Sequence, residues 1–142
     1  MEFVYIIDEA QQMKEGSFVV QPAPENQAAL MEENMQRALS DMIILFFLSK
    51  KECYIGELNS LVKEKTNNSM SMVFPYRAIC RMQQFGYVVE GEKRYAPDGR
   101  WRQYYRITDH GRDYLDSLLN AYQRLTQNIS NLLSERFEKG DD

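Results

Sequence analysis

Cysteine, histidine and long apolar runs are all scarce in this chain of 142 residues. Its two cysteines, Cys53 and Cys80, lie far apart and its only histidine is His110, so the closely spaced ligands of a structural zinc site are missing. Two reduced thiols in a cytoplasmic protein fit the cysteines best. The longest apolar run, residues 42–48, is far shorter than the ~20 residues that a membrane span needs. We therefore expect a soluble, cytoplasmic protein with no metal, no cofactor and no membrane contact.

Motifs for catalysis are also missing. The sequence has no glycine-rich phosphate loop and no nucleophile elbow, and neither cysteine has a histidine near it in sequence. His110 follows Thr108 at the expected start of a helix, where a surface position suits it better than a role as a base. We expect no catalytic residues and no enzymatic activity.

An overall surplus of positive charge is missing as well, because 17 Lys and Arg stand against 21 Asp and Glu, which gives a net charge of −4. That balance argues against a protein that coats nucleic acid by bulk charge. The charges are unevenly distributed, however. Residues 1–70 hold six basic and eleven acidic side chains, residues 71–112 eight and four, and residues 113–142 three and six. The positive surplus is therefore confined to residues 71–112.

The hydrophobic pattern divides the chain into an arm and a helical body. Residues 1–24 contain two strand-like stretches, Phe3–Ile7 and Phe18–Val20, and predict a hairpin-like arm that ends at two prolines. From residue 25 apolar residues recur every three or four positions, as on one helix face: Ala28, Met31, Met35, Ala38, Met42 and Leu45. Ser40 and Asp41 inside this run indicate either a bend or the start of a second helix. Residues 42–48 are apolar on every side and predict a helix at the centre of the core.

The rest of the pattern reads helix, turn, helix, hairpin, helix. Residues 54–65 form one amphipathic helix, and a second begins near residues 71–74, with Pro75 in its first turn and Gly86 at its end. Its expected inward residues are Tyr76, Ile79, Met82 and Phe85. Strands are expected from Tyr87 and over 101–107 around a turn at 97–99, and Thr108 or Asp109 caps the last helix.

This order is that of a winged helix-turn-helix, a mainly α fold with a small β-hairpin wing. We expect an arm over 1–24, a DNA-binding domain with a leading helix over 25–107, and a C-terminal dimerisation helix over 108–139. In such folds the helix after the turn enters the major groove and the wing touches the backbone or the minor groove of double-stranded DNA.

The basic residues predict the DNA-binding side chains. On the helix after the turn, which we call the reading helix, the candidates include arginines that can pair with guanine and a tyrosine whose hydroxyl can hold a phosphate. These candidates are Ser71, Met72, Tyr76, Arg77 and Arg81. The candidates on the wing are Lys93, Arg94, Arg100, Arg102 and Arg106. Strand alternation assigns Arg100, Arg102, Tyr104 and Arg106 to a phosphate-gripping face, and Trp101, Gln103, Tyr105 and Ile107 to a face packed on the helices. The alternative is a solvated basic hairpin without a ligand.

The last helix carries a heptad seam of apolar residues: Leu115, Leu118, Tyr122, Leu125, Ile129 and Leu132. About 30 residues would give a rod of roughly 45 Å. Such a seam needs a partner surface, and a homodimer is the commonest solution; the alternative is packing on the chain's own helices. Tyr114 and Tyr122, with the Met31–Met35 face, can line an apolar crevice for a small aromatic effector, although such a stripe also serves as plain core or interface.

One series of motif residues comprises Tyr76, Ile79, Met82 and Gly86-Tyr87-Val88, and a wing-to-helix passage contains Gly99-Arg100, Tyr105-Arg106-Ile107-Thr108-Asp109, Gly111 and Leu115. With these motifs, about residues 40–135 resemble the PadR-like family of transcriptional regulators, and the resemblance is specific in the second half of that range. Tyr54-Ile55-Gly56-Glu57-Leu58 is similar to the start of the family's second helix. Two features depart from the family: residues 1–24 have no counterpart, and Pro75 precedes Tyr76 where the family usually has Tyr followed by Pro.

The resemblance implies a dimeric DNA-binding protein, usually a repressor, which small aromatic ligands commonly release from DNA. A winged-helix protein-interaction module without DNA binding is the alternative function, and the acidic flanks of the basic segment favour it. A ligand sensor of a related multidrug-response type is a further alternative.

Overall fold

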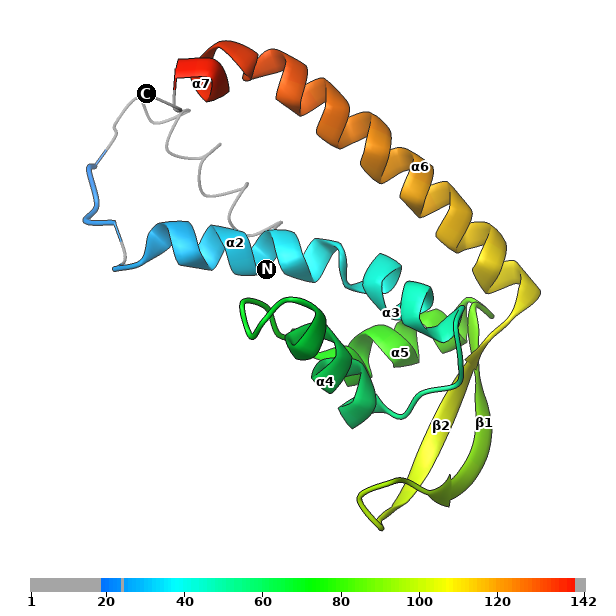
Figure 1. The fold of residues 1–142 in the computed structure, drawn as a ribbon. Helices are drawn as coiled ribbons and strands as arrows, with labels where there is room; N and C mark the ends of the chain where they lie inside the picture. The colour runs from blue at the N-terminus through cyan, green and yellow to red at the C-terminus, as the bar shows by residue number, and fades with distance from the viewer. Residues whose placement is uncertain (1–18, 24, 140–142) are drawn as a thin grey trace. The chain divides into compact units, whose positions relative to one another are not determined.

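The computed structural model describes residues 19–23 and 25–139, which form helices and one hairpin (Figure 1). The elements are α2 (Gln27–Ala38), α3 (Ser40–Leu48), α4 (Ile55–Lys65), α5 (Pro75–Gln84), β1 (Val88–Tyr95), β2 (Trp101–Ile107), α6 (Asp109–Leu132) and α7 (Ser134–Lys139). The chain divides within α2 into two units, residues 1–31 and 32–142. The second unit contains the predicted winged helix-turn-helix, so the fold predicted from the sequence is confirmed.

The short described part of the N-terminal arm contains no strand. Val19 and Val20 are exposed and lie in irregular backbone, so the strand predicted over 18–20 is wrong at these two residues. No strand among the described residues pairs with them, so their β-branched side chains have no described sheet to join. The other predicted strand, Phe3–Ile7, lies outside the described residues. Helix α2 follows and buries none of its side chains.

The apolar run that crosses residue 39 forms two helices rather than one bent helix. Helix α2 ends at Ala38 and α3 begins at Ser40. The buried Ser40 hydroxyl donates to the carbonyl oxygens of Gln36 and Arg37, at 3.3 and 2.7 Å, and so satisfies the free C-terminal end of α2. Serine therefore acts here as a cap for the preceding helix.

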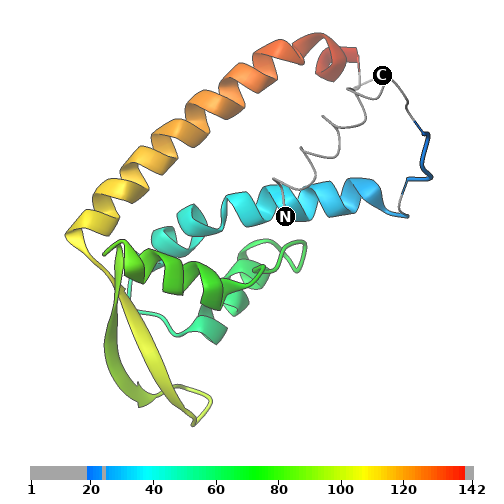
Figure 2. The ribbon, with the colours of Figure 1, turned by 180° about the vertical axis from the view of Figure 1, so that it is seen from behind.

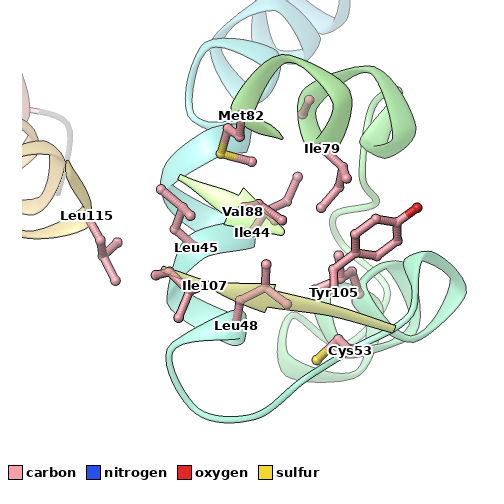
Figure 3. Close-up of a cluster of buried hydrophobic side chains, with 12 residues drawn as sticks. Ile44, Leu45, Leu48, Cys53, Ile79, Met82, Val88, Tyr105, Ile107 and Leu115 are labelled. Carbon is pink, nitrogen blue, oxygen red and sulfur yellow. The ribbon is translucent and has the colours of Figure 1, made fainter. Parts of the chain in front are cut away.

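Helix α3 lies at the centre of the hydrophobic core. Ile44, Leu45 and Leu48 are buried, as expected for a helix at the centre of the core, whereas the apolar Phe46 is 43% exposed. Figure 3 shows side chains of α3, α5, α6 and both strands meeting here, and Leu58 of α4 belongs to the same cluster. The buried cluster consists of Ile44, Leu45, Leu48, Cys53, Leu58, Ala78, Ile79, Met82, Val88, Tyr105, Ile107 and Leu115.

Helices α4 and α5 pack on α3 through their apolar faces and form the helix-turn-helix. Leu58 and Val62 are buried on α4, and Ala78, Ile79 and Met82 on α5. Pro75 is the first residue of α5, where its missing N–H has no bond to lose. Tyr76 and Phe85, which were expected to point inward, are 62% and 61% exposed.

The wing is a two-stranded antiparallel hairpin, which projects from the helices (Figures 1 and 2). A β-bulge interrupts β1 between Glu90 and Lys93. The segment before α4 lies beside β2 and joins it by a single isolated bridge, in which Cys53 and Tyr105 exchange backbone hydrogen bonds of 3.3 and 2.8 Å. Gly86 and Gly99 adopt the left-handed conformation expected from their positions at a helix end and a turn, with φ of +75° and +82°.

Helix α6 is joined to the wing by a tight N-terminal cap. The Thr108 hydroxyl accepts a hydrogen bond from the Gly111 N–H at 2.9 Å and donates one to the Gly86 carbonyl at 2.6 Å. The helix ends at Leu132, and the short α7 follows. Its 24 residues span about 36 Å, so the prediction of a single rod of about 30 residues is wrong.

Candidate nucleic-acid interface

The first turn of α5 is the exposed part of the predicted reading helix. Tyr76 and Arg77 both lie in this turn and are exposed, whereas the face that begins at Ala78 packs on the core. The Arg77 guanidinium lies 5.1 Å from the centre of the Phe74 ring, a cation–π contact that leaves its charge without a carboxylate partner. Phe74, just before the helix, is in the left-handed conformation with φ of 49°.

The other candidates near this helix are placed differently. Ser71 and Met72 precede α5, and Met72 is half-buried against the core, with its N–H bonded to Asn59 Oδ1 at 3.0 Å. Arg81 lies in the last turn and forms an ion pair with Asp41 of α3. Of the five predicted side chains, the structure therefore brings Tyr76 and Arg77 together on the exposed first turn.

Two wing arginines are engaged within the chain. Arg94 Nη1 lies 3.1 Å from Glu52 Oε2, and its guanidinium lies 3.6 Å from the centre of the Tyr104 ring. Arg102 Nη2 lies 2.8 Å from Asp98 Oδ2. These contacts raise the pKa of both arginines, through the Glu52 and Asp98 side chains respectively, and the bond from Arg102 is the largest cause that lowers the pKa of Asp98.

These side chains form a layered cluster that we call the wing anchor: Glu52, Tyr54, Arg94, Asp98, Arg102 and Tyr104. Tyr54 and Tyr104 pack edge to face with ring centres 5.4 Å apart, and Arg102 lies over the Tyr54 ring at 5.2 Å. Tyr104 is buried beneath this layer, so its predicted place on an open phosphate-gripping face is wrong. The wing anchor joins both strands to the segment before α4 and thereby fixes the direction of the wing.

Trp101 also departs from the prediction. It was expected to pack on the helices, but it is 58% exposed and contacts Tyr95 across the hairpin. Tyr105 and Ile107, on the same predicted face, are buried in the core. The face is therefore covered near the body of the protein and open at the wing tip.

The side-chain charges of the remaining basic candidates of the wing lie outside ion-pair distance of the described carboxylates, although the Arg100 backbone N–H donates to Asp98 Oδ1 at 3.0 Å. Lys93, Arg100 and Arg106 are exposed, and none of them forms an ion pair with any described residue. Together with Arg77, they are the charges of this surface that remain available to a polyanion. Near them, Asp98 is neutralised by Arg102, and Glu92 lies 3.8 Å from Arg94.

The predicted seam of α6 divides into a buried and an exposed half. Leu115 is buried among the core residues, where Figure 3 shows it reaching from α6 toward Leu45. Its predicted role in a dimer seam is therefore replaced by a role in the chain's own core. Leu118 is half-buried against the core. The residues beyond are exposed, namely Tyr122 (39%), Leu125 (60%), Ile129 (43%) and Leu132 (82%).

Two apolar hollows lie beside α3. One of about 180 Å³ lies between α3 and α6 and includes both Tyr114 and Tyr122, the tyrosines expected to line a crevice. Tyr114 stacks on Tyr87 with ring centres 4.1 Å apart, and its burial is the largest cause that raises its pKa. The other hollow, of about 290 Å³, lies between α3, α4 and Leu119. Met35 is exposed on α2 and lines neither hollow.

Other chemistry has little support in the described part of the chain. No three histidine, cysteine or acidic side chains there come close enough together to hold a metal ion. His110 is exposed and packs beside the Tyr87 ring at 4.8 Å. No helix within residues 19–23 and 25–139 is both long and apolar enough to span a membrane.

Sequence reasoning missed the carboxylates that neutralise basic candidates of this surface. Asp41 and Glu52 lie 40 and 42 residues from the arginines they bind, a separation that carries no local signal. Asp98 and Arg102 are four residues apart across the hairpin turn, and that short spacing between opposite charges was the only signal available.

Comparison with known proteins gives the same fold and adds a family. The model of the "Transcriptional regulator PadR-like family" matches residues 44–117, more than half of the chain. A PadR-like transcriptional regulator from Bacillus cereus is similar to 70% of this chain over 96% of its own, with 25% identity and a TM-score of 0.60. A transcriptional regulator from Clostridium thermocellum is similar to 69% of this chain over 92% of its own, with 27% identity and a TM-score of 0.59.

Among curated proteins, an uncharacterized protein X of Lysinibacillus sphaericus is 29% identical over 111 residues, which are 77% of this chain and 100% of that protein. The family model extends from the core helix α3, through the helix-turn-helix and the wing, to the first turns of α6. On that evidence the chain belongs to the PadR-like family of transcriptional regulators.

Proposed function

We propose that this regulator binds double-stranded DNA with the first turn of α5 in the major groove and the wing along the adjacent backbone. The observation that carries the proposal is the division of the basic candidates. Arg81, Arg94 and Arg102 are neutralised by carboxylates, whereas Arg77, Lys93, Arg100 and Arg106 are exposed and form no ion pair with the residues that the structure describes. A surface with unpaired cations on a reading helix and a wing fits a duplex, whose phosphates supply the missing partners.

A salt titration of DNA binding tests this proposal. The logarithm of the binding constant falls with the logarithm of salt concentration by about 0.9 per phosphate contact, so loss of one contact reduces the slope by about 1. We expect Arg100→Gln and Arg106→Gln to weaken binding to all duplexes and to reduce the slope. Arg124→Gln is the matched control, since Arg124 is an exposed arginine on α6, away from the wing. Unchanged slopes in both wing variants would contradict the proposal.

The absence of any salt-dependent DNA binding by the unmodified protein would instead favour a winged-helix module that binds other proteins. An electrophoretic shift at low and at physiological salt distinguishes the two functions. The operator is best identified by selection from random duplexes, and a pseudo-palindrome with half-sites about one DNA turn apart is expected for a two-fold symmetric protein.

We further propose that the protein acts as a homodimer through the exposed half of α6. Leu125, Ile129 and Leu132 form an apolar row that no part of the described chain covers, and such rows mark interaction surfaces. Sedimentation at micromolar concentration should show a dimer, and Ile129→Lys should give a monomer. Ser130→Lys adds the same charge at a neighbouring exposed polar position and should leave the dimer intact. A monomeric wild-type protein would refute this assignment.

Repression and effector release complete the proposal. Repression is tested with a reporter gene placed downstream of the selected operator, whose expression should fall when the regulator is present. For the effector, the hollow of about 180 Å³ beside Tyr114 and Tyr122 has the volume for a single aromatic ring. Para-cresol should release the protein from DNA and Leu118→Trp, which fills the hollow, should abolish that response. Equal DNA affinity with and without saturating cresol would reject this ligand.

A further inference from the structure

The wing ends in an exposed pair of aromatic side chains. Tyr95 and Trp101 are the last paired residues of the hairpin, and their rings meet edge to face with centres 4.9 Å apart. They are 71% and 58% exposed, and neither belongs to the hydrophobic core or packs against it. The fold does not need large apolar side chains at this place, because the wing anchor already fixes the hairpin. Such an exposed pair is typical of a contact surface.

The strand register shows which face of the wing carries the pair. Tyr95 and Trp101 lie opposite each other, as do Lys93 and Gln103, so all four belong to one face of the hairpin. Tyr105 continues this face into the core. There burial is the largest cause that raises the pKa of Tyr105, followed by Tyr76 of α5, by Glu90, which is paired with Tyr105 across the hairpin, and by Cys80 of α5. The aromatic pair therefore lies on the face that continues toward the exposed first turn of α5.

The opposite face of the wing is already occupied. Arg94, Arg102 and Tyr104 alternate with the residues of the aromatic face and contact Glu52 and Tyr54. A partner that approaches the wing tip without displacing the wing anchor has to meet Tyr95 and Trp101.

The charges around the pair indicate the chemistry of that partner. Lys93 shares the face and Arg100 adjoins Trp101, and both are exposed without an ion-pair partner among the described residues. A surface that combines apolar rings with unpaired cations fits a polyanion that also presents apolar area. The minor groove of DNA has this combination, since phosphates border walls of deoxyribose, and apolar side chains commonly wedge against its base steps.

We infer that Trp101 and Tyr95 form an aromatic contact with the deoxyribose walls or base steps of the minor groove that flanks the half-site read by α5. The inference rests on the proposed DNA binding and adds the residues that make an uncharged contact. The contact contributes to affinity without neutralising a phosphate, so its loss changes the binding constant but leaves the salt slope unchanged.

Trp101 is the only tryptophan of the chain, so its emission reports on this site without a label. The protein is titrated with a 30-base-pair mixed-sequence duplex at low salt, while a fluorescein label on the DNA records binding by anisotropy. We expect the Trp101 emission to change along the same curve and Trp101 to become protected from acrylamide. Trp101→Ala should weaken binding about tenfold, since one aromatic stack on a base is worth about that much, and Trp101→Phe should restore most of it.

The possible results distinguish a failure of the aromatic contact from a failure of the proposed DNA binding. If labelled DNA is not bound at all, the proposed DNA binding fails. If DNA is bound but Trp101 stays open to acrylamide, or if Trp101→Ala binds as tightly as wild type, only the aromatic contact is overturned. Protection that rises with protein concentration in the absence of DNA would assign the pair to a protein interface and overturn it as well. Thermal melting of Trp101→Ala, an exposed substitution, verifies that the variant is folded.

Discussion

Gly111 allows the closest approach between helix α6 and the wing, and its replacement by alanine is a sharp test of this packing. A Cβ at this position would lie 2.1 Å from the Tyr87 carbonyl oxygen and 2.9 Å from Ile107 Cγ1. Ordinary contact begins near 3.4 Å, so α6 would have to move by more than about 1 Å. The Tyr87 carbonyl cannot easily yield, because it accepts a hydrogen bond from the Thr108 N–H at 3.1 Å.

The cost of Gly111→Ala follows from these contacts. Overpacking of a close site costs about 1–3 kcal/mol. The displacement also strains the bond to the Tyr87 carbonyl and the Thr108 cap, each worth about 1 kcal/mol. Alanine returns about 1 kcal/mol through its higher helix propensity. We therefore expect a loss of about 2–4 kcal/mol in the free energy of unfolding, measured by urea denaturation followed by circular dichroism.

Gly56→Ala is the matched control for Gly111→Ala. Gly56 is also near the start of a helix, but the atom nearest to an added Cβ is the Tyr54 ring, at 3.1 Å. The edge of this half-buried ring has to shift by only a few tenths of an ångström, so we expect a change within about 1 kcal/mol. If Gly111→Ala were as stable as wild type while Gly56→Ala behaved as expected, the close crossing of α6 over the wing would be refuted.

Three further predictions concern the core and the wing anchor. Leu115→Ala, in the core, should lower the free energy of unfolding by about 2–5 kcal/mol, and the exposed Leu125→Ala by less than about 1 kcal/mol, both measured with urea at low protein concentration. Similar losses in the two variants would contradict the difference in burial between these residues. Burial raises the pKa of Cys53 to about 12 from 9.0, so the stability it contributes is fully present below pH 9 and is lost as pH rises toward 12. Cys53→Ala should flatten urea midpoints measured across that window, and an unchanged curve would contradict the shift. Arg94→Gln removes the ion pair with Glu52, so the time-resolved anisotropy of Trp101 should show faster local motion of the wing. The salt slope of DNA binding should stay unchanged, and a slope reduced by about 1 would show that Arg94 contacts a phosphate.

The order of the elements was predictable because each boundary has a local chemical cause. Pro75 can begin a helix, Gly86 and Gly99 supply left-handed backbone, and Thr108 caps α6 through its own hydroxyl. These signals depend on residues next to each other in sequence. The confirmed parts of the prediction are of this kind.

The inward face of α5 was predicted incorrectly for a geometric reason. Residues spaced by three advance 300° around a helix, so each step turns back by about 60°. From Tyr76 to Phe85 the three steps add up to half a turn, and only Ile79 and Met82 in the middle still face the core. Ala78, four residues before Met82, completes the buried face. An unbroken spacing of three therefore overstates the width of a buried stripe.

Strand alternation alone does not predict which of the two faces of the wing packs on the body of the protein. Alternation separates the side chains of β2 into two sets but does not show which set meets the body of the protein. That choice depends on the isolated bridge at Cys53, which pairs with Tyr105 and brings Glu52 and Tyr54 beside the arginine face. A single bridge of this kind has no periodicity of its own to detect.

The charge of the basic segment has a different meaning once its contacts are known. Residues 71–112 carry a surplus of four positive charges, and the sequence treats their eight basic side chains as equivalent. The structure divides them: Arg81 pairs with Asp41 and Arg94 with Glu52, both outside the segment, while Glu92 and Asp98 inside it pair with Arg94 and Arg102 respectively. Arginines with planar guanidinium groups suit both tasks, since they stack on rings within the wing anchor and offer paired donors to phosphate elsewhere. The contacts of each arginine therefore determine whether it stabilises the wing or remains available to a ligand. The net charge counted along the sequence does not measure the positive charge that is available for binding.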